Sequence, residues 1–196
     1  MRLFVKICGV STAPVAETCV EQGVDAIGFV FADSPRRVTP EQAELISSAL
    51  PPGISRVAVF RRPGPEEVRA VLAGFRPDLV QADHDTLTAL DGIGLLPVFH
   101  EGGAEPEGGR FLYEGPVSGV GRRVGPVKAA QIARLGEMVL AGGLNPGNVA
   151  EAITQVRPFG VDVSSGVETS PGVKGPALIR SFVEAVRAAE ERLVSA

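Results

Sequence analysis

The chain has 196 residues, of which 44% are hydrophobic and 21% charged, and its formal net charge is −4. This length allows one sizeable hydrophobic core, and the composition is ordinary for a soluble globular protein. An acidic balance without a basic run gives nucleic-acid binding little electrostatic support. No apolar stretch approaches membrane-spanning length, and Met1 leads into a strand pattern rather than a signal peptide. We therefore expect a cytoplasmic protein that binds neither nucleic acid nor membrane.

The two cysteines, Cys8 and Cys19, are too few for a disulfide framework. Neither has a spacing typical of metal ligands, so we expect no metal site. A cysteine that ends an apolar run, as Cys8 does, is most often a small core residue when nothing else is known of it.

Apolar runs recur along the chain and predict eight β-strands. They cover residues 3–8, 26–31, 55–60, 78–82, 95–100, 110–114, 138–141 and 160–163. Helical patterns lie between most of them, at residues 13–21, 39–50, 65–75, 85–90, 127–135 and 145–156. A long last helix has Leu178, Ile179, Phe182, Val183 and Val186 on one face. Pro97 is unusual inside a strand, and no helical pattern fills residues 101–109.

Two of the helices have clear start signals. Thr39 is a good N-cap, and Pro40 follows it in the first turn, where proline is tolerated. Asn145 and Pro146 have the same arrangement, so we predict that this helix begins with Asn145 as its N-cap.

The order of these elements predicts the fold. Near-continuous apolar strands that alternate with helices indicate a parallel sheet that is buried on both faces. Eight such units predict a single compact (β/α)8 TIM barrel over residues 1–196, with the helix after strand five missing or very short. The rival is a doubly wound open sheet, which more often has five or six strands.

Small residues follow the last two predicted strands, as Gly142-Gly143 and as Ser164-Ser165-Gly166. The two strands and the helix between them form a βαβ unit, so both loops lie at the carboxyl ends of parallel strands. Glycine leaves backbone N–H groups bare and serine adds hydroxyl donors, which suits a phosphate dianion. We therefore predict that these five residues bind phosphate.

Several segments together resemble the phosphoribosylanthranilate isomerase family. They are KICGV at 6–10, DAIGFVFADSPRRVTPEQA at 25–43, LAGGLNPGNV at 140–149 and RPFGVDVSSGVETSPGVK at 157–174. The resemblance implies a TIM-barrel enzyme of tryptophan biosynthesis. Its reaction is the Amadori rearrangement of N-(5-phosphoribosyl)anthranilate, an aminoaldose, to 1-(2-carboxyphenylamino)-1-deoxyribulose 5-phosphate, an aminoketose. The family uses neither a cofactor nor a metal.

The resemblance also implies roles for particular residues. The cysteine of the KICG segment is the general base in this family, and here it is Cys8. The general acid is an aspartate at the end of strand six, where this chain has Glu114. An arginine after strand two binds the anthranilate carboxylate, which points to Arg36. Asp162 is expected to contact substrate, with an ion pair to Lys6 as the alternative.

The end of strand four departs from the family pattern. The family commonly has Gln-Leu-His-Gly there, whereas this chain has Gln81-Ala82-Asp83-His84. The roles of Asp83 and His84 are left open by this difference. Histidines in the positions of His84 and His100 are more typical of structural or exposed residues than of catalytic ones.

The chemistry accounts for the pair of catalytic groups. A carboxylic acid whose pKa is raised toward neutrality can protonate the ring oxygen and open the ring. A thiolate can then remove the C2 proton, although an ordinary thiol with a pKa near ~8.5 is only slightly ionised at neutral pH. Lys6 has the same strand parity as Cys8, about 7 Å away, so we hypothesise that Lys6 favours the thiolate.

Other functions fit the same loops. One is a different phosphosugar isomerase on a TIM barrel, and another is a catalytically inactive sensor of a phosphorylated ligand. In each case the partner is a small phosphorylated molecule. A second copy of the chain would add stability to so small a barrel, so a homodimer is also considered.

Overall fold

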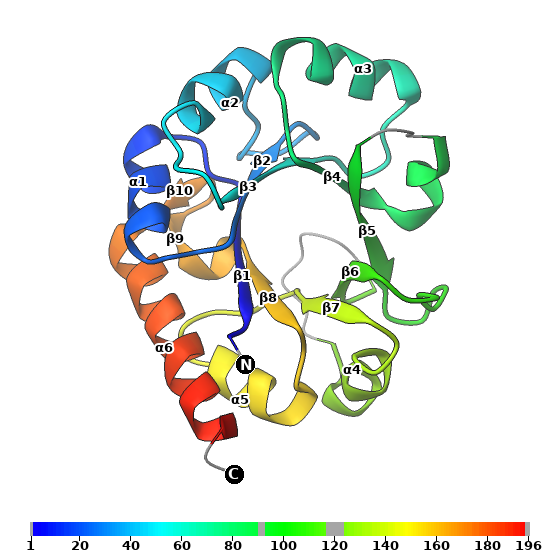
Figure 1. The fold of residues 1–196 in the computed structure, drawn as a ribbon, viewed down its shortest axis with the longest axis vertical. Helices are drawn as coiled ribbons and strands as arrows, with labels where there is room; N and C mark the ends of the chain where they lie inside the picture. The colour runs from blue at the N-terminus through cyan, green and yellow to red at the C-terminus, as the bar shows by residue number, and fades with distance from the viewer. Residues whose placement is uncertain (1, 90–92, 117–123, 195–196) are drawn as a thin grey trace.

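The computed structural model describes residues 2–89, 93–116 and 124–194, and its centre is a closed barrel of eight parallel strands (Figure 1). Each strand pairs with the next, and the first pairs with the last. The strands are β1 (Phe4–Cys8), β2 (Ala26–Val30), β3 (Ser55–Val59), β4 (Leu79–Asp83), β5 (Gly94–His100), β6 (Arg110–Glu114), β7 (Glu137–Leu140) and β8 (Gly160–Val163). The predicted (β/α)8 barrel is thereby confirmed, and the doubly wound alternative is wrong.

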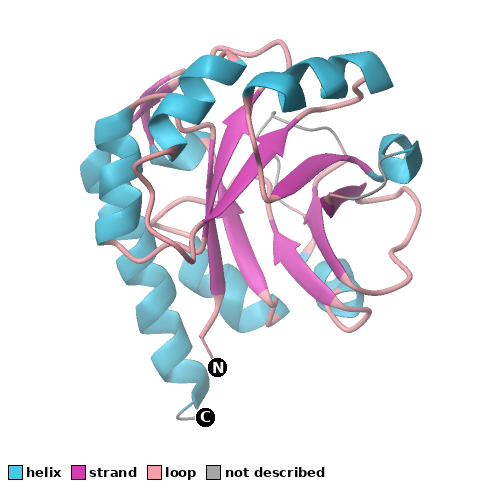
Figure 2. Ribbon diagram, turned by 45° about the horizontal axis from the view of Figure 1, so that its top comes forward, coloured by secondary structure: helices cyan, strands magenta, loops and turns pink. Residues whose placement is uncertain are grey.

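Helices surround the barrel on the outside (Figure 2). They are α1 (Ala13–Glu21), α2 (Pro40–Ser47), α3 (Pro65–Gly74), α4 (Pro126–Ile132), α5 (Val149–Val156) and α6 (Pro176–Val194). The predicted helix at 85–90 is the 3-10 helix η1 (His84–Ala89), and residue 90 lies outside the described residues. Residues 101–109 connect β5 to β6 through turns and bends without a helix, as predicted.

Most element boundaries agree with the sequence to within a few residues, but the start of α5 does not. The helix begins at Val149 with Asn148 as its N-cap, three residues after the predicted cap Asn145. The Asn145 side chain instead accepts a hydrogen bond from Gly147 N at 2.9 Å, and the Asn148 side chain accepts one from Asn145 N at 2.9 Å. These bonds stabilise a tight turn that precedes the helix.

The capping prediction for α2 is confirmed. Thr39 Oγ1 accepts a hydrogen bond from Gln42 N, and the Gln42 side chain accepts one from Thr39 N at 2.8 Å. This reciprocal capping box satisfies donors that the first turn would otherwise leave without partners.

A short hairpin that the sequence did not predict follows β8. It consists of β9 (Glu168–Ser170) and β10 (Val173–Lys174), which pair antiparallel after the 3-10 helix η2 (Ser165–Val167). Gly172, in the turn, has a φ of +83° and lies against the backbone of Pro35. The hairpin therefore packs against the loop that follows β2.

The two faces of the barrel wall have different surroundings. Successive residues of a strand point to opposite faces, so Val5 and Ile7 pack in the main core against the helices while Lys6 and Cys8 point inward. The inward apolar residues form two clusters, which include Ala26, Val30, Val57 and Val59 in one and Leu96, Val98, Leu112 and Ala141 in the other. The barrel is thus filled by side chains apart from its carboxyl-terminal end.

Aromatic side chains lie near the opposite end of the barrel, where the strands begin. The Arg110 guanidinium lies over the rings of Phe4 and Phe159, 5.1 and 4.6 Å from their centroids, and Arg110 also donates to Glu137.

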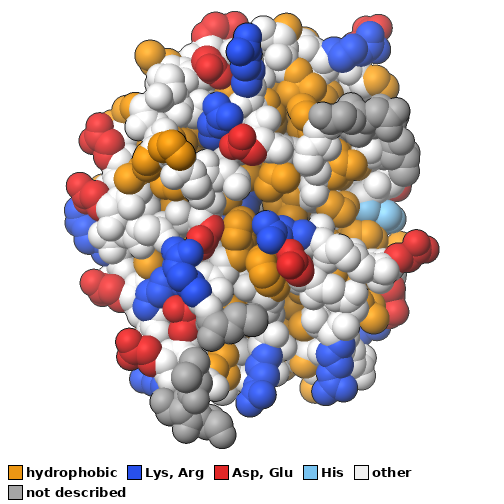
Figure 3. Space-filling model, in the orientation of Figure 1, with side chains coloured by type: hydrophobic (Ala, Val, Ile, Leu, Met, Phe, Trp, Pro, Cys, Tyr) orange, Lys and Arg blue, Asp and Glu red, His pale blue; other side chains and the backbone are white. Residues whose placement is uncertain are grey.

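In the orientation of Figure 1, the space-filling view shows hydrophobic side chains around the middle of the face and charged side chains of both signs among them (Figure 3). Of the described helices, none is both long and apolar enough to cross a membrane.

Candidate active site

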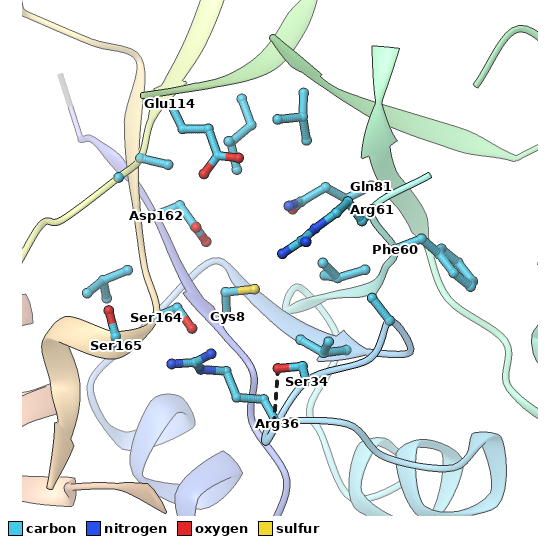
Figure 4. A pocket seen from close by; sticks show the side chains of 18 of the residues that line it. Cys8, Ser34, Arg36, Phe60, Arg61, Gln81, Glu114, Asp162, Ser164 and Ser165 are labelled. Atoms are coloured by element: carbon cyan, nitrogen blue, oxygen red, sulfur yellow. Dashed lines mark hydrogen bonds between the residues drawn. The ribbon is translucent and has the colours of Figure 1, made fainter. Parts of the chain in front are cut away.

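The carboxyl ends of the strands surround a cavity of about 480 Å³ (Figure 4). Its walls come from β1 and β8, which are neighbours in the barrel, and from the ends of β4 and β6 and the loops around them. Cys8 and Glu114 both line this cavity, from the ends of β1 and β6. In Figure 4 the Glu114 carboxyl group points inward from the far rim, and Asp162 lies between it and the Cys8 thiol. Two titratable groups of different chemistry therefore face one enclosed space.

Lys6 lies beneath Cys8 and is completely buried inside the barrel. Its ammonium group donates to Asp162 Oδ1 at 2.7 Å, so the predicted alternative ion pair forms, although Asp162 also lines the cavity. Burial opposes the charge on Lys6, but Asp162 and Cys8 outweigh it, and the pKa of Lys6 is raised. Lys6 is therefore a fixed positive charge within the barrel.

Lys6 lowers the pKa of Cys8, which is the predicted direction, but this effect is smaller than that of burial. Burial raises the pKa of the Cys8 thiol, Lys6 lowers it, and the net result is a pKa above the ordinary value. The residue as a whole is 7% exposed. Lys6 thus limits the rise in the thiol pKa and does not produce a low value.

Gly28 of β2 provides the space in which Cys8 and Lys6 meet. A methyl group at this position would lie 3.2 Å from Cys8 Sγ, 3.2 Å from Lys6 Nζ and 3.1 Å from Val59 Cγ2. Because both functional atoms and a core side chain approach this one point, the absence of a side chain at Gly28 permits their arrangement.

Arg36 reaches the cavity from the loop after β2. Its Nε and Nη2 donate to the two carboxylate oxygens of Glu168 at 2.7 and 2.9 Å, which is a bidentate pair. Its aliphatic stem packs over Gly9, where an added Cβ would lie 2.7 Å from Arg36 Cδ. The guanidinium group is therefore held in one orientation at the edge of the cavity (Figure 4).

Glu168 and Lys174, on the β9–β10 hairpin, were not singled out from the sequence. Lys174 is 5% exposed, and its ammonium group donates to Glu168 at 2.6 Å and to the backbone oxygen of Ser164 at 3.0 Å. Burial opposes the charge on Glu168, but hydrogen bonds from Arg36 and Lys174 outweigh it and lower the pKa of Glu168 to about 2. The sequence GVETSPGVK carried a weak signal in the Pro-Gly pair of its turn.

Four of the five predicted phosphate-binding residues line the cavity, namely Gly142, Gly143, Ser164 and Ser165. Gly142 and Gly143 have φ values of +87° and +66°, which favour glycine. Gly166 does not line the cavity. It lies against the backbone carbonyl of Leu144, so a side chain there would separate the two loops.

The cavity is also lined by Arg61, Gln81 and Asp83, none of which was assigned a role from the sequence. Figure 4 shows Arg61 and Gln81 side by side, across the cavity from Ser164. Gln81 is 7% exposed, and its Oε1 atom has no hydrogen-bond partner among the described residues. The cavity therefore presents a buried acceptor as well as two guanidinium groups, those of Arg36 and Arg61.

The two histidines have different surroundings. His84 stacks on the ring of Phe99 with 4.5 Å between centroids, and its buried Nδ1 has no partner among the described residues. His100, at the end of β5, lies between two carboxyl groups of the cavity wall, those of Asp83 and Glu114. Within the described parts of the chain, no group of three His, Cys, Asp or Glu side chains could hold a metal ion.

An eight-stranded α/β barrel with a thiol, carboxyl groups and two guanidinium groups at the carboxyl ends of its strands defines a class, the TIM-barrel enzymes. Comparison with known families then specifies the member of this class. Residues 5–90 and 115–185 match the family described as N-(5'phosphoribosyl)anthranilate (PRA) isomerase. The chain belongs to this family.

Individual relatives agree over nearly the whole length. The N-(5'-phosphoribosyl)anthranilate isomerase of Chlorobium phaeovibrioides is 38% identical, and the alignment covers 95% of this chain and 98% of the relative. That of Streptococcus gordonii is also 38% identical, over 93% and 97% of the two chains.

Solved structures of the same family have the same fold. The phosphoribosyl anthranilate isomerase of Thermus thermophilus has a TM-score of 0.84 at 32% identity, covering 96% of this chain and 99% of that one. A second structure, with a TM-score of 0.81 at 32% identity, is a complex with reduced 1-(o-carboxyphenylamino)-1-deoxyribulose 5-phosphate and covers 95% and 99%.

Proposed function

We propose that this cavity catalyses the Amadori rearrangement of N-(5'-phosphoribosyl)anthranilate, with Cys8 as the general base and Glu114 as the general acid. The reaction is that of the family, and it belongs to tryptophan biosynthesis. The observation that carries the assignment of roles is that a thiol at the end of β1 and a carboxyl group at the end of β6 line one cavity. Both steps of the reaction can then occur on one bound substrate.

The first step opens the ribose ring. The Glu114 carboxylic acid donates its proton to the ring oxygen as the bond from that oxygen to C1 breaks, and the nitrogen lone pair forms an iminium ion. In the second step the Cys8 thiolate removes the proton from C2, and the electrons of that bond neutralise the iminium to give an enolamine. Tautomerisation of the enolamine then gives the aminoketose. Carboxyl and thiol groups are both suited to such proton transfers.

The raised pKa of Cys8 fits this order of steps. Before the ring opens, burial favours the neutral thiol. The iminium ion places a positive charge beside C2, and an adjacent positive charge stabilises a thiolate. Together with Lys6, this charge opposes the effect of burial on the thiol. The Cys8 thiol is therefore deprotonated most readily at the step that needs a proton acceptor.

The two ends of the substrate carry negative charge, and each has a group to receive it. The loops at Gly142-Gly143 and Ser164-Ser165 follow adjacent paired strands, and we assign the phosphate to them. Arg36 uses two of its five N–H donors on Glu168, so its remaining donors are available to the anthranilate carboxylate. Asp162 and the buried Gln81 acceptor are suited to the hydroxyl groups between these ends.

A biosynthetic role also supports a cytoplasmic location. We further propose that the chain forms a homodimer. One solved relative is described as coming from a dimeric phosphoribosylanthranilate isomerase of Thermotoga maritima. Light scattering on the purified chain tests this point, because a monomeric mass at micromolar concentration would contradict it.

The decisive experiment is turnover of freshly prepared phosphoribosylanthranilate by the wild type and by Cys8→Ala, Glu114→Gln and Cys19→Ala. We expect losses of roughly 100- to 10,000-fold for the first two variants, which is the usual contribution of an acid or base. The matched control is Cys19→Ala, because Cys19 is also a buried cysteine but lies on α1. This variant should retain activity. A wild type without turnover would contradict the function, and a fully active Cys8 or Glu114 variant would contradict that residue's role.

A further inference from the structure

We propose that His100 is a positioning residue that supplies Glu114 with the proton it gives to the substrate. The inference rests on the proposed function, because it needs Glu114 to act as the acid. It adds a residue that does not itself line the cavity and that acts only through its contact with the acid.

His100 lies at the end of β5, between the ends of β4 and β6. Its Nε2 atom is 3.1 Å from Asp83 Oδ1, and its Nδ1 atom is 3.2 Å from Gly115 O and 3.7 Å from Glu114 Oε1. The imidazole ring thus lies between two carboxyl groups of the cavity wall and is hydrogen-bonded to the one from β4. Its side chain is 23% exposed, so water reaches the ring.

The contacts of the ring restrict where its protons are placed. Asp83 as a carboxylate and Gly115 O can only accept hydrogen bonds, so a ring nitrogen bonded to either must donate a proton to that bond. The imidazolium form makes both bonds with Glu114 as a carboxylate. The neutral form with its proton on Nε2 keeps the bond to Asp83 and gives up the bond to Gly115 O, so that its bare Nδ1 can accept a proton from a Glu114 carboxylic acid. The two arrangements contain the same number of protons and differ by one transfer between Nδ1 and Glu114 Oε1.

This transfer completes the proton balance of the reaction. One turnover moves a proton from Glu114 to the substrate oxygen and another from C2 to Cys8, which leaves Glu114 ionised and Cys8 neutral. Cys8 released its own proton to water when the iminium ion formed, so the proton from C2 restores its neutral starting state, and His100 takes one proton from water and passes it to Glu114. The net number of protons is unchanged, and no other reactant is needed.

Carboxyl groups face the ring from both neighbouring strands, Asp83 from β4 and Glu114 from β6. Arg62, in the loop after β3, donates to Asp83 Oδ2 at 3.1 Å and to Asp85 at 2.5 Å. Asp83 is thereby held by Arg62 on one oxygen while its other oxygen faces His100. Glu101, the next residue after His100, accepts a hydrogen bond from Gly125 N instead.

The test compares His100→Ala and His100→Gln with the wild type, with Glu114→Gln and with a matched control. His84→Gln is the control, since it is the same substitution at the only other histidine of the sequence. For each variant, kcat and KM are measured from pH 5 to 9, with and without added imidazole, after circular dichroism has established that it is folded. We expect His100→Ala and His100→Gln to lose roughly 10- to 100-fold in kcat with little change in KM.

Imidazole separates a proton-transfer role from a structural one. Added imidazole should restore part of the kcat of His100→Ala, with a rate that increases with the concentration of its protonated form, and should leave His84→Gln unchanged. Unchanged kcat in both His100 variants, or a loss that imidazole does not restore, would overturn the proposal. If the wild type is inactive or Glu114→Gln is fully active, the proposed function or its acid fails first. An active wild type, a slow Glu114→Gln and a fast His100→Ala would overturn only this inference.

Discussion

Replacement of Glu168 by glutamine is expected to lower the free energy of unfolding by about 3 kcal/mol at neutral pH. The Glu168 carboxylate accepts hydrogen bonds from Arg36, from Lys174 and from the backbone N–H of Gly172, and its side chain is only 4% exposed. Glutamine has nearly the same shape but no charge, so the variant leaves two cations without their shared counter-charge.

The magnitude follows from the pKa of Glu168. The folded chain lowers this pKa from an ordinary value of 4.5 to about 2. One pKa unit corresponds to about 1.4 kcal/mol, so the carboxylate contributes roughly 3 kcal/mol at neutral pH. The loss has a limit, because burial lowers the pKa of Lys174, and this lysine can therefore release its proton in the variant.

The stabilisation that Glu168 contributes depends on pH in a direction set by its lowered pKa. Because the folded pKa is depressed, the stabilisation is complete above pH ~4.5 and is lost as the pH falls toward 2. Urea unfolding of both proteins between pH 2.5 and 7 should show a difference that is largest at neutral pH and shrinks with acid. Glu67→Gln, on the exposed side of α3, is the matched control. Equal stability at pH 7, or a difference that does not change with pH, would refute the reasoning.

Two further predictions concern the thiol. Gly28→Ala places a methyl group 3.2 Å from Cys8 Sγ and should lower kcat while costing about 1–3 kcal/mol of stability. Gly64→Ala, where a methyl group meets nothing within 4 Å, is the control, and an unchanged kcat in Gly28→Ala would contradict the prediction. Lys6→Met should raise the pKa of Cys8 further, because Lys6 is the largest effect that lowers it. The rate of Cys8 alkylation by iodoacetamide against pH measures this shift, and a titration curve identical to that of the wild type would count against it.

The barrel could be predicted from the sequence because every strand is a short apolar run and helical patterns lie between most of them. Even β5, which contains Pro97, keeps its place in the order because its neighbours β4 and β6 pair with it on both sides. The start of α5 could not be predicted, because Asn145 and Asn148 are equally good caps. Only the bonds that their side chains accept, from Gly147 N and from Asn145 N, decide between them. The β9–β10 hairpin is too short to show an alternating pattern.

The candidate site was predicted only in part, because some of its contacts join residues that are far apart in the sequence. The family pattern pointed to Cys8 and Arg36, and the structure brings both to one cavity. Glu168, 132 residues from Arg36, and Lys174, which anchors Glu168, could not be predicted, since no local pattern connects these positions. The net pKa of Cys8 also depends on burial, which spacing along a strand does not reveal.

The pairing of Lys6 with Asp162 has a consequence for synthesis on the ribosome. Lys6 emerges before its counter-charge, which follows 156 residues later on the last strand of the barrel. A partly made barrel that closed over Lys6 would enclose an ammonium group without a carboxylate, which is costly. We therefore expect the incomplete chain to remain open around β1 until β8 arrives. The ion pair thus favours completion of the chain before the barrel closes, and ribosome-bound chains that end before residue 160 should expose β1 to proteolysis.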